Sequence, residues 1–191
     1  MELGVFSYRS IKNTPVEKME SSKVDCRNVY VSSSGFSTVD NVFDGAFAAV
    51  DIAKGQLVEK GIMRRLSDNN NRTFDGMNHS MVFTWSDDVP NYTWAFGSGC
   101  ATFYNTGLDG ECNTRMIRYF DEDRFEIFAT KDIKAGDELT HTYKSLAWRT
   151  TFVPMHNELV AKKGMNPGEG EADLTGKSPL QGAVRSINGD A

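Results

Sequence analysis

Two side chains able to take part in chemistry stand two positions apart near the end of the sequence, His141 and Tyr143. A tyrosine hydroxyl can position a reacting group through a hydrogen bond without competing as a nucleophile. A neutral imidazole can accept a hydrogen bond or hold a water, whereas a charged imidazole repels a cation. The chain has three cysteines, Cys26, Cys100 and Cys112. The count is odd and no two of them stand at metal-binding spacing, so we expect neither a disulfide framework nor a bound metal.

An internal repeat precedes this pair and indicates how it is positioned. The pattern Ala-x-x-Asp-Ile-x-x-Gly occurs at residues 48–55 and again at residues 129–136. Each copy predicts a strand, a turn and a second strand, with the isoleucine packed inward and the glycine at a positive φ. Two copies are too few for a solenoid, so they predict two similar units within one small β-rich domain. The alternative is that two unrelated β-turns share these residues.

The composition is typical of one globular domain with tails. Of the 191 residues, 39% are hydrophobic and 11% are aromatic, which is enough to bury a core. The formal net charge of -5 argues against direct nucleic-acid binding through bulk electrostatics and suits a basic partner, such as a lysine-rich peptide. No apolar stretch is long enough to cross a membrane, and the N-terminus lacks a signal-peptide pattern. We therefore expect an intracellular protein without a membrane partner.

Changes in composition divide the chain into segments. Residues 1–27 are polar and are predicted to form an N-terminal extension, and residues 28–150 carry the short strand patterns of the folded domain. Within that domain, residues 64–80 are rich in Asn, Asp and Ser and are predicted to be a loop. Residues 151–163 are predicted to close the domain. In residues 164–191, Gly, Pro, Glu and Ser dominate, so a flexible tail is expected.

The second copy of the repeat continues as G-D-E-L-T-H-T-Y, ending at Tyr143. Together with the first copy and the pair Tyr104-Asn105, it resembles the SET domain, the fold of most protein-lysine methyltransferases. That family has an opening G-x-G-x-F-A-x-x-D-I-x-x-G, then N-H-S-C-x-P-N, then A-x-x-D-I-x-x-G-E-E-L-T-x-x-Y. All three blocks occur here in this order, the middle one in a degraded form. The aromatic runs at residues 83–85 and 94–97 are similar to those of short stand-alone SET proteins of bacteria, viruses and algae.

The resemblance implies an α+β fold that is mostly β. Such a SET fold, of β-clip type, consists of several short, curved sheets, with the C-terminal segment threaded under a preceding loop as a pseudoknot. The threading would bring Asn105 next to Tyr143 and build the cofactor site between them. Residues 28–150 would then be the SET domain itself.

The function that the resemblance implies is transfer of a methyl group from S-adenosylmethionine to a lysine of a protein or peptide, a histone being one candidate. The implied catalytic residues are Tyr143 and His141. The residues implied to bind the cofactor are Asp44, Gly45, Ala46, Phe47, Asn105, Thr106 and Trp148. The residues implied to line a narrow substrate channel are Met81, Phe83 and Tyr104. A desolvated channel would offset part of the cost of deprotonating the lysine, which is about 4.6 kcal/mol at pH 7 for a pKa of about 10.4.

The sequence departs from the family pattern at four positions. Phe43 replaces the first glycine of the opening motif, Thr106 replaces a histidine, Met81 stands where a second tyrosine is common, and His141 stands where Tyr or Phe is usual. The Asn-His-Ser run at residues 78–80 comes too early in the chain to be the middle motif. Because a charged His141 would repel the substrate ammonium, we expect activity to rise above the pKa of the histidine.

Two other functions are consistent with these departures. A SET-like module could bind the cofactor or a peptide without transferring a methyl group, as Met81 and Thr106 suggest. Alternatively, the altered channel could accept a small amine in place of a protein. Loss of transfer in Tyr143→Phe would indicate an enzyme, whereas cofactor binding without turnover would indicate the module. Residues 146–159 could close the channel or form a homodimer contact.

Overall fold

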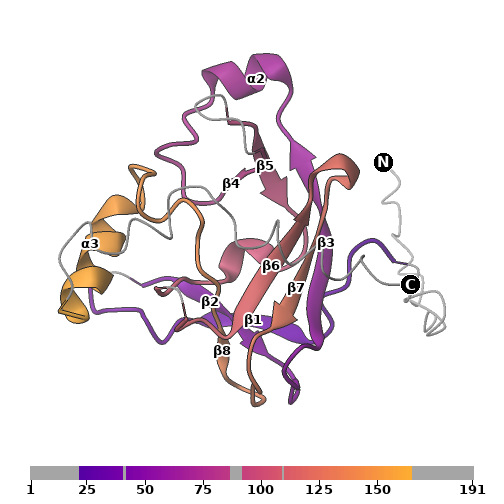
Figure 1. Cartoon of the computed structure of the whole chain (residues 1–191), viewed down its shortest axis with the longest axis vertical. Helices are drawn as coiled ribbons and strands as arrows, with labels where there is room; N and C mark the ends of the chain where they lie inside the picture. Colours follow the sequence, from indigo (N-terminus) through magenta and orange to yellow (C-terminus); the bar gives the residue numbers. More distant parts are fainter. Residues whose placement is uncertain (1–21, 41, 87–91, 109, 165–191) are drawn as a thin grey trace, which may run out of the picture.

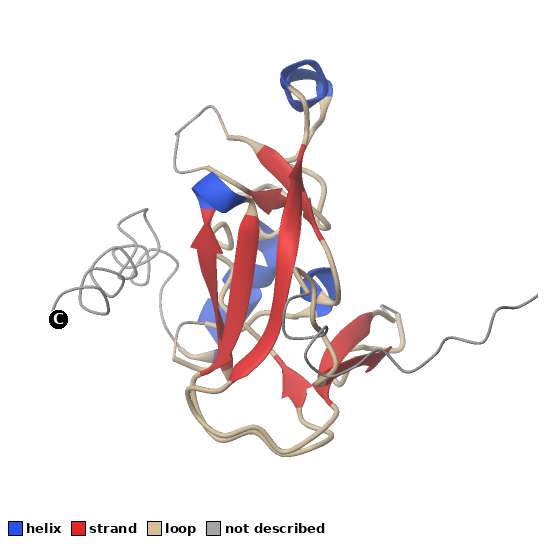
Figure 2. Cartoon of the chain, turned by 90° about the vertical axis from the view of Figure 1, so that its right-hand side faces the viewer, coloured by secondary structure: helices blue, strands red, loops and turns tan. Residues whose placement is uncertain are grey.

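The structure is a computed structural model that describes residues 22–40, 42–86, 92–108 and 110–164. It contains two antiparallel sheets (Figures 1 and 2). The smaller sheet has the order β1-β2-β8, with strands Val29–Ser33, Asp44–Ala48 and Glu138–Leu139. The larger sheet has the order β4-β5-β3-β7-β6, with strands Phe83–Thr84, Trp94–Gly97, Leu57–Arg65, Arg124–Ala129 and Thr114–Tyr119. The fold is therefore mostly β, as the sequence predicted.

Within the described residues, four short helical elements accompany the sheets. They are α2 (Asp68–Thr73), η1 (Ala101–Phe103), η2 (Phe120–Glu122) and α3 (Val153–Lys162). α2 lies inside the segment that was predicted to be a loop, and that prediction is wrong there. α3 forms most of the predicted closing segment, and Pro154 in its first turn has no helical hydrogen bond to lose. In the described part of the chain, no helix is long and apolar enough to cross a bilayer.

The two copies of the repeat pair with each other. Their glycines, Gly55 and Gly136, have φ values of 83° and 89°. Ile52 and Ile133 are buried and form an antiparallel bridge, with reciprocal N–H···O bonds of 2.9 Å. One copy leads from β2 to β3 and the other from β7 to β8, so both cross from one sheet to the other, and they run side by side at the lower end of Figure 2. The inward isoleucines and the positive-φ glycines are confirmed.

An acidic turn, residues 121–123, connects β6 to β7. Asp123 there has a φ of 49°, the left-handed conformation that aspartate tolerates better than most residues. Its carboxylate accepts hydrogen bonds from Trp85 Nε1 over 2.9 Å and from Arg65 Nε over 2.5 Å. Arg65 also donates to the carbonyl of Phe120. These contacts tie the turn to β3 and to the core.

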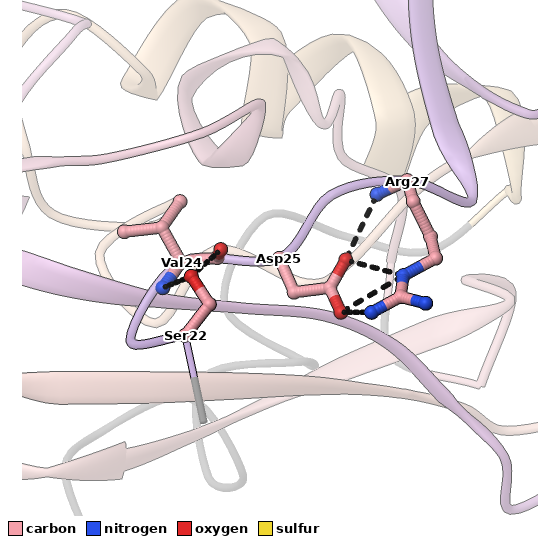
Figure 3. A network of polar contacts seen from close by, with 4 residues as sticks. All are labelled: Ser22, Val24, Asp25 and Arg27. Atoms are coloured by element: carbon pink, nitrogen blue, oxygen red, sulfur yellow. Dashed lines mark hydrogen bonds and ion pairs between the residues drawn. The ribbon is translucent and has the colours of Figure 1, made fainter. Parts of the chain in front are cut away.

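Residues 22–27, predicted to belong to the extension, contact the folded domain. Asp25 bridges Lys60 of β3 through backbone bonds of 2.8 and 3.0 Å. Its carboxylate accepts hydrogen bonds from the backbone and guanidinium of Arg27, the shortest over 2.6 Å, and these bonds lower the pKa of Asp25 (Figure 3). The hydroxyl of Ser22 donates to the carbonyl of Val24 beside this pair (Figure 3). Residues 1–21 and the predicted tail beyond residue 164 lie outside the described residues.

The main core draws on both sheets. Its fully buried members include Trp85, Phe125, Ile127 and Leu139. A second, smaller cluster comprises Leu108, Leu146, Phe152 and Val160. Burial of one such large side chain contributes about 1.5–3 kcal/mol, so this second cluster docks α3 onto the domain. Tyr143 packs against it, which places the predicted catalytic tyrosine at the junction of α3 and the sheets.

Candidate functional site

The segment that carries His141 and Tyr143 lies between two other segments of the chain. On one side, Thr140 pairs in parallel with Asn105, and the His141 N–H donates to the Asn105 carbonyl over 3.0 Å. On the other side, the Thr140 N–H donates to Asn113 Oδ1 over 2.8 Å. The Asn105 and Tyr143 regions are therefore neighbours, an arrangement that the resemblance implied.

The hydroxyl of Tyr143 is held at a defined place. It donates to the carbonyl of Tyr104 over 2.6 Å, and the Tyr143 N–H donates to Thr106 Oγ1 over 3.1 Å. The ring packs against Phe152, with the two ring centroids 4.9 Å apart. Burial raises the pKa of Tyr143, so the hydroxyl stays protonated at neutral pH and takes part only in hydrogen bonds. Thr106, in place of the family histidine, orients the backbone of this tyrosine.

His141 is buried beside the same hydroxyl. Its ring lies 5.5 Å from the ring of Tyr104 and 5.4 Å from that of Tyr143, between centroids. Among the described residues, no group hydrogen-bonds to its Nδ1. Burial, assisted by the charge of Arg118, lowers the pKa of His141 to about 3. The imidazole is therefore neutral at any physiological pH, so the expected rise in activity above the pKa of His141 would fall near pH 3, below the physiological range.

A cavity of about 40 Å³ lies beside His141 and Tyr143. It has room for about three water-sized groups, which is enough for the amine end of a lysine and a methyl group. Phe83 and Met81, two of the three predicted channel residues, are part of the lining. Met81 is 57% exposed and so lies at the solvent side of the cavity.

The charged side chains of this lining are all cations: Arg118, Lys144 and Arg149. No carboxylate contributes to the lining within the part of the chain that the structure describes. Burial lowers the pKa of Arg149 to about 10, which leaves the guanidinium charged at neutral pH. Because like charges repel, the cavity disfavours an ammonium ion and favours a neutral amine.

Tyr104, the third predicted channel residue, lies in the core instead. Its side chain is fully buried, and its hydroxyl donates to Glu59 Oε2 over 2.9 Å. Glu59 is also fully buried and accepts a second hydrogen bond from the Cys100 N–H over 2.7 Å. Burial raises the pKa of Glu59 to about 7, although both hydrogen bonds act in the opposite direction. Tyr104 serves the site through its carbonyl, which accepts the hydroxyl of Tyr143.

Part of the predicted cofactor set gathers at the N-terminal end of β2. Asn105 Nδ2 donates to Glu138 Oε1 over 2.8 Å, Ser34 Oγ over 3.1 Å and the Asp44 carbonyl over 3.3 Å. Gly45 lies against this group, since a Cβ there would stand 2.3 Å from Glu138 Oε1. A larger residue would have to shift the Glu138 carboxylate, so the close neighbour of Gly45 is a group of the chain itself, and its contact with a cofactor stays a prediction. Glu138 belongs to the D-E-L motif that marked this segment, yet the motif alone did not predict a place for its carboxylate in the site.

Three other members of that set, Ala46, Phe47 and Trp148, make contacts of a different kind. Ala46 and Phe47 lie within β2, paired with β8, so their backbones serve the sheet. Trp148 stacks on Tyr92 with ring centroids 4.6 Å apart. A carboxylate, a hydroxyl and an amide nevertheless converge beside Gly45, and this donor and acceptor set fits the ammonium and carboxylate of an amino-acid-like ligand. Among the described residues, no group of three His, Cys, Asp or Glu side chains could hold a metal ion.

The comparisons with known proteins agree with this geometry. The family model described as "SET domain" matches residues 44–144, a span that contains Gly45, Asn105 and Tyr143. The chain belongs to the SET domain family. The α+β SET fold predicted from the sequence is thereby confirmed.

Individual relatives share only part of their length with this SET domain chain. It is 31% identical over 106 residues to the H3 lysine-4 specific histone-lysine N-methyltransferase of Schizosaccharomyces pombe. This match covers 52% of the present chain and 11% of the yeast protein. Among solved structures, the Neurospora SET domain protein DIM-5, a histone lysine methyltransferase, matches with a TM-score of 0.44 and 20% identity over 61% of this chain and 53% of its own. The ctPRC2 complex bound to S-adenosylmethionine matches with a TM-score of 0.47 and 23% identity, over 73% of this chain and 17% of its own.

Proposed function

We propose that this SET domain chain is a protein-lysine N-methyltransferase that uses S-adenosylmethionine. The observation that supports this most directly is the cavity beside Tyr143, which combines a fixed hydroxyl, the neutral His141 and a cationic lining. The proposed substrate is a lysine of a protein or peptide, a histone being one candidate. The net charge of -5 is in keeping with a basic substrate.

The first task of the site is to receive a neutral amine. Deprotonation of a free lysine at pH 7 costs about 4.6 kcal/mol of free energy. The charges of Arg118 and Arg149 raise the energy of an ammonium ion in the cavity, so the lysine loses its proton to solvent as it enters. A ring nitrogen of the neutral His141 can then accept an N–H of the amine, which leaves the amine lone pair available for transfer.

The second task is orientation. S-adenosylmethionine, when bound, supplies an electrophilic methyl group, and Asp44, Gly45 and Asn105 are the residues proposed to hold it. The Tyr143 hydroxyl, fixed by the Tyr104 carbonyl, is proposed to position the amine and the methyl group in line. Correct orientation of two reactants can supply about 7–11 kcal/mol of a reaction barrier. Because the hydroxyl stays protonated, it does not compete with the amine as a nucleophile.

The proposal is tested with methyl-labelled S-adenosylmethionine, core histones and a host-like lysate, for the native chain and for Tyr143→Phe. We expect a labelled protein band with the native chain and its loss in the variant, with both chains folded by circular dichroism. Equal label in both lanes would remove Tyr143 from the mechanism. Cofactor binding without any label would favour the non-catalytic module, and label only in small molecules would favour a small-amine methyltransferase.

A further inference from the structure

Arg149 is a buried arginine held by backbone carbonyls. It is 2% exposed, and its guanidinium donates to the carbonyls of Gly76 over 2.6 and 3.1 Å, of Val82 over 2.9 Å, and of His79. A guanidinium carries five donors in a rigid fork, whereas a lysine ammonium carries three donors on a flexible stem and does not hold several carbonyls in the same fixed arrangement. Arg149 therefore fixes the positions of three peptide groups in residues 76–82.

Aromatic rings hold Arg149 itself in place. Its guanidinium carbon lies 5.1 Å from the centre of the Trp94 ring and 4.8 Å from that of the Phe152 ring. The backbone adds a further tie, because the Thr151 N–H donates to the Met77 carbonyl over 3.1 Å. The segment that leads into α3 is thus joined to residues 76–82 through side-chain and backbone contacts.

Residues 76–82 form one wall of the cavity. Ser80 and Met81 belong to the same lining as His141 and Tyr143, and both are exposed. The segment contains turns and no helix or strand, so no sheet or helix ladder holds it in place. The Asn-His-Ser run that does not serve as the middle SET motif lies here, and its histidine carbonyl is one of the acceptors of Arg149.

We propose that Arg149 is a positioning residue that makes residues 76–82 a fixed wall of the cavity, and so sets the path by which the substrate amine reaches Tyr143. This inference rests on the proposed function. The SET match ends at residue 144, and Ser145, Arg149 and Phe152 of the following segment belong to the cavity lining, so this inference assigns that segment the task of completing the cavity.

The test compares Arg149→Lys, which keeps the charge but has too few donors for the four hydrogen bonds of the arginine, with a second variant that changes residues 76–82 themselves. Gly76→Ala is that variant, because a Cβ at Gly76 would stand 2.2 Å from the Trp94 ring and must displace either the wall or this ring, against which Arg149 packs. Arg65→Lys is the matched control: Arg65 also donates to a backbone carbonyl, that of Phe120, but in the β6–β7 turn outside the cavity lining.

We expect both wall variants to speed backbone hydrogen exchange in residues 76–82. We also expect them to lower kcat/KM for a lysine peptide by about 10- to 100-fold, mainly through KM, because small misplacements are enough for such losses. The affinity for S-adenosylmethionine should stay within about twofold, since only the peptide path is altered. Arg65→Lys should leave KM unchanged even if it lowers the melting temperature.

An unchanged KM in either folded wall variant would overturn the role of Arg149 while leaving the proposed function intact. A fall in cofactor affinity equal to the fall in kcat/KM would also overturn it, because the wall would then serve the cofactor site or the whole fold. If the native chain transfers no methyl group to any lysine, the proposed function fails first, and this inference falls with it.

Discussion

Replacement of Glu59 by glutamine should change how the stability of the protein depends on pH. Glu59 is fully buried, and burial raises its pKa from 4.5 to about 7, so the folded state favours the protonated acid. Glutamine keeps the shape of that acid and stays neutral. Its amide oxygen can accept the Cys100 N–H, and its amide N–H can donate to the Tyr104 hydroxyl.

The sign and size of this change in unfolding free energy follow from the difference between the pKa of Glu59 in the folded and in the unfolded chain. Between pH 4.5 and pH 7 the folded protein keeps the Glu59 proton that the unfolded chain has lost, so stability falls as pH rises through this window. The contribution is fully present below the unfolded pKa of 4.5 and is lost by the time the pH exceeds about 7. A group whose pKa differs by one between the folded and unfolded chain changes the unfolding free energy by about 1.4 kcal/mol. Between pH 4.5 and pH 7 the unfolding free energy of the native protein should therefore fall by about 3 kcal/mol more than that of Glu59→Gln.

The measurement is urea unfolding of both proteins at several pH values from 4.5 to 8. The difference in unfolding free energy between variant and native protein should rise in favour of the variant by about 3 kcal/mol across this range. Glu158→Gln, which removes an exposed carboxylate of α3, is the control for the loss of one charge. Parallel curves for the native protein and Glu59→Gln would refute the argument, since they would mean that Glu59 titrates alike in the folded and unfolded chain.

Three further outcomes follow from the site. The pH profile of kcat/KM should show no inflection between pH 5.5 and 7.5 from His141, whose pKa burial lowers to about 3; an inflection that disappears in His141→Phe would contradict this. Gly45→Ala should cost about 1–3 kcal/mol in thermal unfolding, because the new Cβ overlaps the Glu138 carboxylate, and the cost should shrink in a Glu138→Ala background. Tyr143→Phe should lower the transfer rate by about 100-fold or more while its unfolding free energy drops by only about 1 kcal/mol, the value of one hydrogen bond; equal losses in both would make the residue structural.

Local sequence patterns determined the β-rich units and the residues that the site is built around. The turns at Gly55 and Gly136 have a positive φ. Because glycine adopts this conformation far more readily than other residues, the local sequence is enough to predict it. The motif that ends in Tyr143 identified the family and its neighbour Asn105. The predictions for the two turns held because turn chemistry depends on residues close in sequence.

The helices were harder to foresee. α2 has no buried residue, so no apolar stripe marks it in the sequence. α3 is only ten residues long and is marginal as an isolated helix. Its docking through Phe152 and Val160 onto the second cluster stabilises it, and that contact exists only in the folded chain.

Only the tertiary structure decided which polar side chains are buried and what they hold. Tyr104 is adjacent to Asn105 in sequence, yet its hydroxyl donates to Glu59, 45 positions earlier, and Tyr104 is not part of the cavity lining. Nothing in the sequence around Arg149 distinguishes it from an exposed arginine. Its hydrogen-bond acceptors are carbonyls 73 and 67 positions earlier in the chain. A buried charge is tolerated only where hydrogen-bond partners, here from distant parts of the sequence, surround it with the right geometry. The sequence contains the donors and acceptors of these hydrogen bonds, but only the folded structure shows which donor reaches which acceptor.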